Sequence, residues 1–121
     1  MDASTPVKRF LLDRDQFLAY ADIGSSTGHH PPVLLLHGGG VDHRMRVPQL
    51  HAFPNHRVIA PDARGHGASS TPADPYRRVD DVVALLDGLD LDAVVAVGLS
   101  MGAATGIDLA VEYPDRVRRL V

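Results

Sequence analysis

The stretch that decides the fold is "VVAVGLSMGAATGIDLA", which runs from Val94 to Ala110. An apolar run ends at Gly98, a serine stands at position 100, and Gly102 opens a segment of small and apolar residues. A strand that turns directly into a helix forces the residue at the turn into a sparsely populated backbone conformation, which costs about 1–3 kcal/mol. Only very small side chains fit two positions before and after such a turn, which explains both glycines. The spacing therefore predicts that Ser100 lies above the carboxyl end of a buried strand.

Two earlier apolar runs resemble the one before Ser100. "VLLLHGGG" (Val33 to Gly40) and "RVIAPD" (Arg57 to Asp62) are continuous rather than alternating. Continuous apolarity is typical of strands buried on both faces, as in parallel sheets. "VKRFLLDRD" and "FLAYADIG" (Phe17 to Gly24) precede them, and their spacing predicts a two-stranded hairpin.

Helical periods separate the buried runs. Before Val94, one predicted apolar face consists of Val79, Val82, Val83, Leu86 and Leu89, with Asp80, Asp81 and Asp87 elsewhere. After Ser100, the same spacing predicts a buried face of Ala103, Ile107, Ala110 and Val111, in a helix that ends at Pro114. Residues 45–52 form a weaker helix candidate, which Pro48 interrupts, and "RVRRLV" resembles the start of one more strand.

The predicted order of elements is β-β-β-α-β-α-β-α-β. It indicates an α/β fold with a mostly parallel sheet, an N-terminal antiparallel hairpin and helices on both faces, in three α/β/α layers. The 121 residues are 45% hydrophobic and 22% charged, which suffices for one small core. Because the chain stops within a strand signal, we expect residues 1–121 to form a single incomplete domain.

Composition and charge narrow the function classes. The net charge of −3 argues against nucleic acid as a partner. The only basic cluster, Arg116, Arg118 and Arg119, alternates with apolar residues, which indicates a solvated edge. The absence of cysteine excludes disulfides and thiolate zinc sites. "MDASTPVKRF" lacks the apolar core of a signal peptide, and the apolar runs are far shorter than a membrane span. We expect a cytoplasmic protein without a membrane partner.

The position of Ser100 suits attack on a carbonyl group. The carboxyl end of an open α/β sheet is where ligands bind, and a helix N-terminus favours developing negative charge. "HGGG" (His37 to Gly40) closes the earlier strand, and its glycines let a backbone N–H point into the space above the sheet. Together with the N–H of Met101 it would form a two-donor oxyanion hole, in which each donor contributes about 3–4 kcal/mol in the transition state. Taken alone, G-x-S-x-G can arise by chance in a loop rich in glycine and serine, and "HGGG" can be a simple tight turn. Their occurrence together, about 60 residues apart, weakens both alternatives.

Three motifs occur in the order "HGGG", "VIAPDARGHGAS" (Val58 to Ser69) and "VGLSMGAA". In this order they resemble the α/β-hydrolase fold family, in its single-domain esterase and peroxidase-like branch, over nearly the whole chain. The resemblance implies that Ser100 is the nucleophile and that the oxyanion donors are the N–H groups of Met101 and of Gly39 or Gly40. It implies that His37 braces this loop and does not transfer protons. The residues it implies for shaping the backbone are Gly38, Asp62, Arg64, Gly65, Gly67, Gly98 and Gly102.

A serine nucleophile needs a histidine base and an acid that orients it. The family order is serine, acid, histidine, but only the acids Asp108, Glu112 and Asp115 follow Ser100, and no histidine does. The seven histidines all precede it: we expect His29, His30, His43, His51 and His56 to be exposed, and His66 to shape its loop or to be exposed and not to act as the base. Adjacent His29 and His30 point apart and lack the spacing of a zinc motif, so no metal or cofactor is expected.

The family's acid and base are therefore expected beyond Val121, with the fold truncated after the nucleophile helix. Because removal of the base costs roughly 10⁶ in kcat, we expect the chain to be inactive alone. The cut sheet leaves an apolar edge, at residues 93–98 or 117–121, which predicts self-association.

The leading hypothesis is a serine hydrolase that acts on small ester-like carbonyl substrates through an acyl-enzyme. Epoxide and haloalkane hydrolases of this fold carry an aspartate at the strand-to-helix turn where this chain has a serine, so Ser100 argues against them. The alternative is a non-catalytic binding or assembly module that keeps the hydrolase scaffold, which the missing base favours and the glycine-rich geometry disfavours. A nucleotide-binding protein is a weaker hypothesis, since neither G-x-G-x-x-G after a strand nor a P-loop motif occurs.

Overall fold

The computed structural model describes residues 5–121, in which six strands form one sheet in the order β1-β2-β4-β3-β5-β6. The strands are β1 (Lys8–Asp13), β2 (Gln16–Ile23), β3 (Val33–Leu36), β4 (Val58–Pro61), β5 (Val94–Gly98) and β6 (Val117–Leu120). β1 and β2 form an antiparallel hairpin, β2 pairs antiparallel with β4, and the remaining pairs are parallel. This confirms the predicted mostly parallel sheet that the chain enters through a hairpin.

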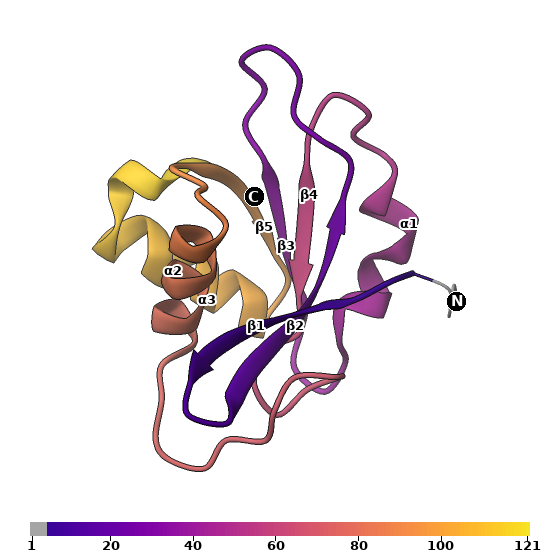
Figure 1. The fold of residues 1–121 in the computed structure, drawn as a ribbon. Helices are drawn as coiled ribbons and strands as arrows, with labels where there is room; N and C mark the ends of the chain where they lie inside the picture. Colours follow the sequence, from indigo (N-terminus) through magenta and orange to yellow (C-terminus); the bar gives the residue numbers. More distant parts are fainter. Residues whose placement is uncertain (1–4) are drawn as a thin grey trace.

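Helices cover both faces of the sheet (Figure 1). α2 (Arg78–Gly88) and α3 (Met101–Glu112) lie on one face, and α1 (Val47–Leu50), preceded by the 3-10 helix η1 (His43–Arg46), lies on the other. A second 3-10 helix, η2 (Pro114–Arg116), leads into β6. The order of elements matches the predicted one. Pro48 does not interrupt α1, because it lies in the first turn, where its missing N–H has no partner to lose.

The core has two parts, one on each face of the sheet. Leu34 and Leu36 of β3 pack with α2 and α3, whereas Val33 and Leu35 of the same strand pack with Leu50 of α1. All four residues of β3 are buried. Burial on both faces is the reason why this strand is apolar at every position.

The predicted buried face of α3 is wrong. Ile107 and Val111 are 52% and 74% exposed. The residues that α3 buries are Gly102, Thr105, Gly106 and Leu109. The first turn of α3 lies directly against the backbone of β3 at Gly102, and Leu109 is the large apolar side chain that the helix buries. Periodicity of apolar residues therefore marked the wrong side of this helix.

The predicted face of α2 is largely right. Val79, Val82 and Leu86 are buried, and Leu85, which the prediction omitted, is buried with them. Asp81 was expected outside this face and is also buried. It lies there because both its carboxylate oxygens accept hydrogen bonds from the guanidinium of Arg64, at 2.6 and 2.9 Å.

One open edge of the sheet is β6. Because β5 pairs with both β3 and β6, residues 93–98 lie inside the sheet, and of the two predicted edges only residues 117–121 lie at its border. Val121 is 72% exposed there.

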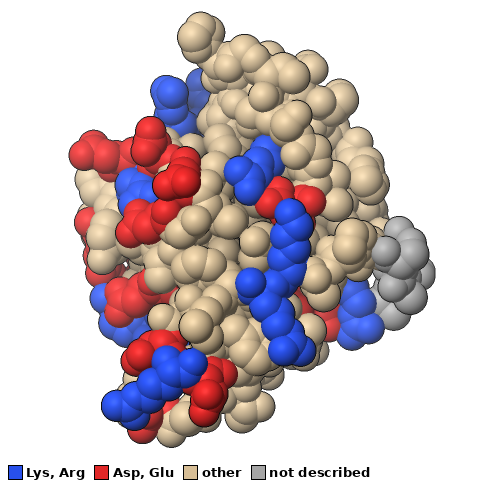
Figure 2. All heavy atoms as spheres, in the orientation of Figure 1, with Lys and Arg blue, Asp and Glu red and all other residues tan. Residues whose placement is uncertain are grey.

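Basic and acidic side chains are interspersed over the face in Figure 2. No helix within residues 5–121 has the length and apolar character needed to cross a membrane.

Candidate active site

Ser100 occupies the turn between β5 and α3 in a strained backbone conformation. Its φ of 53° and ψ of −109° lie in a region that residues with a side chain rarely adopt. Gly98 ends β5, and Met101 begins α3, so the chain reverses over two residues. Such strain persists only where the surrounding structure imposes it, and here the close packing of α3 against the sheet does so.

The glycines around Ser100 are required by backbone packing. A Cβ atom at Gly98 would lie 2.5 Å from the carbonyl oxygen of Gly102. A Cβ atom at Gly102 would lie 2.7 Å from the carbonyl oxygen of His37 and would also collide with that of Leu36. These neighbours are backbone atoms, which cannot rotate away. The structure therefore contains the crowding that the sequence spacing predicts.

The glycine loop after β3 lies beside the turn that carries Ser100. A Cβ atom built on Gly38 would lie 3.6 Å from the carbonyl oxygen of Leu99, and one built on Gly39 would lie 3.8 Å from the Cβ atom of Met101. The N–H of Gly38 donates to the sulfur of Met45 at 3.4 Å. The N–H groups of Gly39, Gly40 and Met101 donate to no acceptor among residues 5–121. The geometry thus leaves the predicted oxyanion donors available.

The hydroxyl of Ser100 is accessible and has no base beside it. Ser100 is exposed, and its side chain makes no hydrogen bond within the described part of the chain. Neighbouring Leu99 is 51% exposed. Of the acids that follow, Glu112 is paired with Arg77 on the outside of α2 and α3. The structure therefore brings Ser100 and the glycine loop together but brings neither an acid nor a histidine to the serine.

His37 links the glycine loop to the loop after β4. It is 2% exposed, its Nδ1 lies 2.7 Å from the carbonyl oxygen of Gly38, and its Nε2 accepts a hydrogen bond from the N–H of Ala63 at 2.9 Å. Burial lowers the pKa of His37 below the usual histidine value, and the hydrogen bond to Gly38 opposes this only in part. A neutral ring with both nitrogens engaged is suited to bracing the loop.

Asp62 organises the loop after β4. Its carboxylate accepts hydrogen bonds from the N–H and Nδ1 of His43, both at 2.7 Å, and from the N–H of Ala68 at 3.0 Å. Gly67 has a φ of 50°, and a Cβ atom there would lie 2.5 Å from the carboxyl carbon of Asp62. The expectation that His43 is exposed is wrong. His43 is buried because its backbone N–H and its ring both hydrogen-bond to this carboxylate. His29, His30 and His51 are exposed as expected, whereas His56 is only partly exposed and its ring contacts that of His30.

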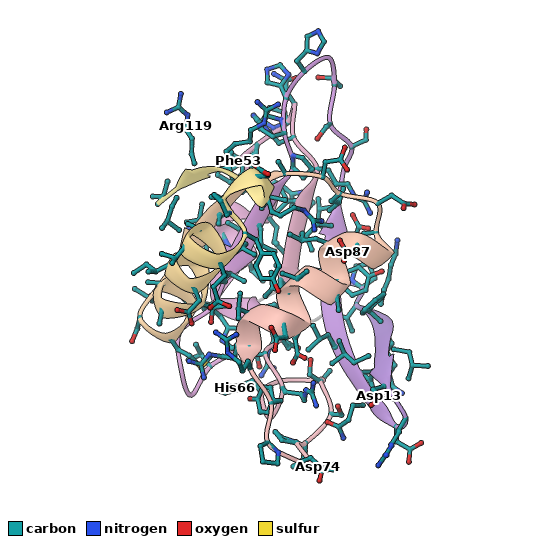
Figure 3. The ribbon with its side chains drawn as sticks, turned by 90° about the vertical axis from the view of Figure 1, so that its left-hand side faces the viewer. Asp13, Phe53, His66, Asp74, Asp87 and Arg119 are labelled. Atoms are coloured by element: carbon teal, nitrogen blue, oxygen red, sulfur yellow. The ribbon has the colours of Figure 1, made fainter. Side chains whose placement is uncertain are left out.

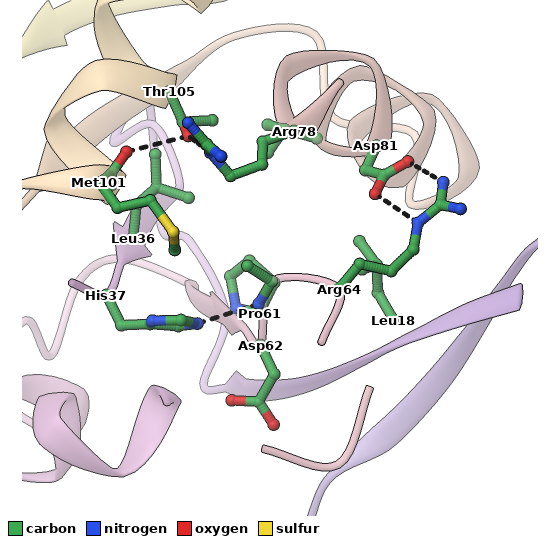
Figure 4. Close-up of a pocket in the computed structure, with 13 residues that line it drawn as sticks. Leu18, Leu36, His37, Pro61, Asp62, Arg64, Arg78, Asp81, Met101 and Thr105 are labelled. Atoms are coloured by element: carbon green, nitrogen blue, oxygen red, sulfur yellow. Dashed lines mark hydrogen bonds and ion pairs between the residues drawn. The ribbon is translucent and has the colours of Figure 1, made fainter. Parts of the chain in front are cut away.

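A small cavity of about 30 Å³ lies between the strand ends and the two helices (Figure 4). Met101 and Thr105 of α3 line one side, the Arg64–Asp81 pair lines the opposite side, and His37 lies at its base. Its volume suits one or two water molecules. Thr105 donates to the carbonyl oxygen of Met101 at 3.1 Å and accepts from Nε of Arg78 at 3.1 Å, which ties α2 to the first turn of α3.

Comparison with known proteins decides the family. The family model described as "alpha/beta hydrolase fold" matches residues 31–121. The chain belongs to the alpha/beta hydrolase fold family. The strained serine between two glycines, and the glycine loop beside it, are thus features of a hydrolase fold.

The similar proteins are hydrolases of about twice this length. The chain is 38% identical to "3-oxoadipate enol-lactonase 2" of Acinetobacter baylyi over 119 residues, which cover 94% of this chain and 43% of the relative. It is 40% identical to "2-hydroxymuconate semialdehyde hydrolase" of a Pseudomonas species over 100 residues, covering 74% of this chain and 35% of the relative. A crystal structure of the enol-lactonase from Burkholderia xenovorans matches with a TM-score of 0.80 and 37% identity, over 87% of this chain and 42% of that one. This hydrolase-fold chain therefore spans less than half the length of these relatives.

Sequence reasoning missed one buried cation in this hydrolase fold. Arg46 of η1 is buried, and its Nη2 donates to the carbonyl oxygens of Leu36 at 2.9 Å and Val97 at 3.3 Å. Its Nε has no hydrogen-bond partner among residues 5–121. Leu36 is the last residue of β3 and Val97 the last but one of β5, the strands that lead to the glycine loop and to Ser100. No local pattern could have indicated this, because an arginine before a short helix is usually exposed.

Proposed function

We propose that this chain carries the nucleophile and oxyanion hole of a serine hydrolase that acts on small ester-like carbonyl compounds through an acyl-enzyme. The observation that carries the proposal is the placement of Ser100, strained and accessible, beside N–H groups that have no other acceptor. The names of the relatives, an enol-lactonase and a semialdehyde hydrolase, support small carbonyl substrates.

In the proposed reaction, the Ser100 oxygen attacks the substrate carbonyl carbon and its proton passes to a base. The carbonyl oxygen becomes an oxyanion that accepts hydrogen bonds from the N–H of Met101 and of Gly39 or Gly40. The N-terminus of α3 adds to this stabilisation, because its dipole favours negative charge. Collapse of the intermediate breaks the bond to the leaving oxygen, to which the protonated base returns the proton, so that an alcohol departs and an acyl ester remains on Ser100, which water then hydrolyses.

The base and acid of this reaction are proposed to come from residues that this chain does not contain. Asp108 is exposed and Glu112 is paired with Arg77, so neither is placed to orient a base at Ser100. We therefore expect the chain of 121 residues to react at the background rate by itself.

A fluorophosphonate probe tests the proposal, because it reacts with activated serines. The chain would be assayed alone and as a chimera in which the carboxy-terminal part of the Acinetobacter enol-lactonase follows Val121. We expect labelling of Ser100 in the chimera only, detected by mass spectrometry of the peptide. The matched control is the chimera with Ser100→Ala, which should lose labelling and ester hydrolysis while it keeps its circular dichroism spectrum.

A folded chimera that is neither labelled at Ser100 nor active on nitrophenyl esters would reject the hydrolase proposal. That result would favour the alternative of a binding or assembly module built on the hydrolase scaffold.

We also propose that β6 mediates self-association of this chain. Val121 and Leu120 are exposed at the border of the sheet, where unpaired strand backbone can pair with a second copy. We expect sedimentation velocity to show a dimer fraction that increases with concentration. Val121→Lys should reduce this fraction, since a charged edge disfavours strand pairing; a monomer at all concentrations would contradict the proposal.

A further inference from the structure

Two histidines that are 26 positions apart meet at the end of the sheet opposite Ser100. The loops before β3 and β4 lie together at the top of Figure 1, away from the glycine loop after β3. His30 of the first loop and His56 of the second have ring centroids 4.9 Å apart, with planes at 75°. Phe53, which packs edge-on against His56, lies at the opposite end of the molecule from His66 in Figure 3.

In each of these two rings, Nδ1 is hydrogen-bonded to a backbone carbonyl oxygen, and Nε2 is available to bind a ligand. Nδ1 of His30 lies 2.7 Å from the carbonyl oxygen of Thr27, and Nδ1 of His56 lies 2.6 Å from that of Pro31. A carbonyl oxygen only accepts, so both Nδ1 atoms carry the proton and the neutral rings keep a lone pair on Nε2. Neither Nε2 atom has a hydrogen-bond partner within residues 5–121. Histidines that bind metals are held in this way, since the donated N–H fixes the tautomer and the ring orientation.

We propose that His30 and His56 together bind a late first-row divalent cation, such as Zn²⁺ or Ni²⁺, through their Nε2 atoms. Two imidazoles on one ion, at a metal–nitrogen distance of about 2.0–2.1 Å and an angle of about 90–109°, have centroids about 4.5–5.2 Å apart. The observed separation of 4.9 Å lies within this range. Imidazole ligands suit these ions, and water completes the coordination at an exposed site. The ion would join the loop before β3 to the loop before β4.

The other candidate metal cluster within the described residues is Asp42, His43 and Asp62. Its ligand atoms are already occupied. Both oxygens of Asp42 accept from the guanidinium of Arg44, and both oxygens of Asp62 accept from His43 or Ala68. A cation would have to displace Arg44, which is itself positively charged. The two-histidine site is favoured because its Nε2 atoms have no such competitors.

Titration of the untagged chain with ZnCl₂ tests the proposal, independently of any catalytic activity. Isothermal titration calorimetry should show one saturable site, and long-range ¹⁵N NMR should show coordination shifts at Nε2 of His30 and His56 only. His30→Gln and His56→Gln should each weaken binding by about 100-fold, because a single imidazole loses the benefit of the second ligand. Zn²⁺ should raise the thermal unfolding midpoint of the wild-type chain and not that of either variant.

His29→Gln and His51→Gln are the matched controls, since they remove exposed histidines from the same two loops. Both should bind Zn²⁺ like the wild type, and MgCl₂ should give no signal, because Mg²⁺ prefers oxygen ligands. Binding that persists in His30→Gln or His56→Gln would place the ion elsewhere and overturn the proposal. So would an absence of saturable binding in the wild-type chain.

Discussion

An alanine in place of Gly102 would press a methyl group against the backbone of β3 and the loop after it. The new Cβ atom would lie 2.7 Å from the carbonyl oxygen of His37 and closer still to that of Leu36. Ordinary contact begins at about 3.4 Å, so α3 would have to move outward by more than about 0.7 Å. Overpacking of this kind costs about 1–3 kcal/mol.

Gly106→Ala is a matched control within the same helix. Both substitutions gain about 1 kcal/mol of helix propensity, so this gain cancels in the comparison. The Cβ atom at position 106 would lie 2.8 Å from Cδ1 of Leu120, the end of a flexible and partly exposed side chain that can rotate away. The difference between the two variants therefore measures the cost of moving α3 from β3.

We expect Gly102→Ala to be less stable than Gly106→Ala by about 1–3 kcal/mol, which is about 4–12 °C in Tm for a chain of this size. Urea unfolding followed by far-UV circular dichroism would measure both free energies of unfolding. Equal stability of the two variants, or a more stable Gly102→Ala, would refute the inference that backbone crowding selects glycine at position 102.

Two further predictions concern Ser100 and His37. Ser100→Gly should raise the free energy of unfolding by about 1 kcal/mol, because glycine relieves the strain at positive φ. Ser100→Ala keeps this strain and should not stabilise the chain. Equal free energies of unfolding for the two variants in urea would contradict the prediction. Because burial lowers the pKa of His37, the folded chain binds this proton less tightly than the unfolded chain. The contribution of neutral His37 to stability should be complete above about pH 6.5 and be lost as the pH falls through the lowered pKa. An NMR titration that gives this ring a pKa at or above the ordinary histidine value would contradict the prediction.

The sequence alone determined the order of the elements and the position of the serine turn. Continuous apolar runs are a local consequence of burial on both faces of the sheet, and β3 shows this at each of its four residues. Gly98 can be predicted from the sequence because a Cβ atom there would collide with the backbone of Gly102 across the turn, which is a local contact. The spacing also predicts Gly102, although the atoms that exclude a larger residue there belong to β3 and the loop after it.

Only the tertiary structure decided which side chains meet. α3 buries its glycines and exposes Ile107, because its distance from the sheet depends on β3 and not on its own periodicity. The burial of His43 depends on a carboxylate 19 positions away. His30 meets His56 because two strands that are neighbours in the sheet begin side by side. Local sequence fixes backbone conformation, but contacts between distant residues arise only when the sheet brings their strands together.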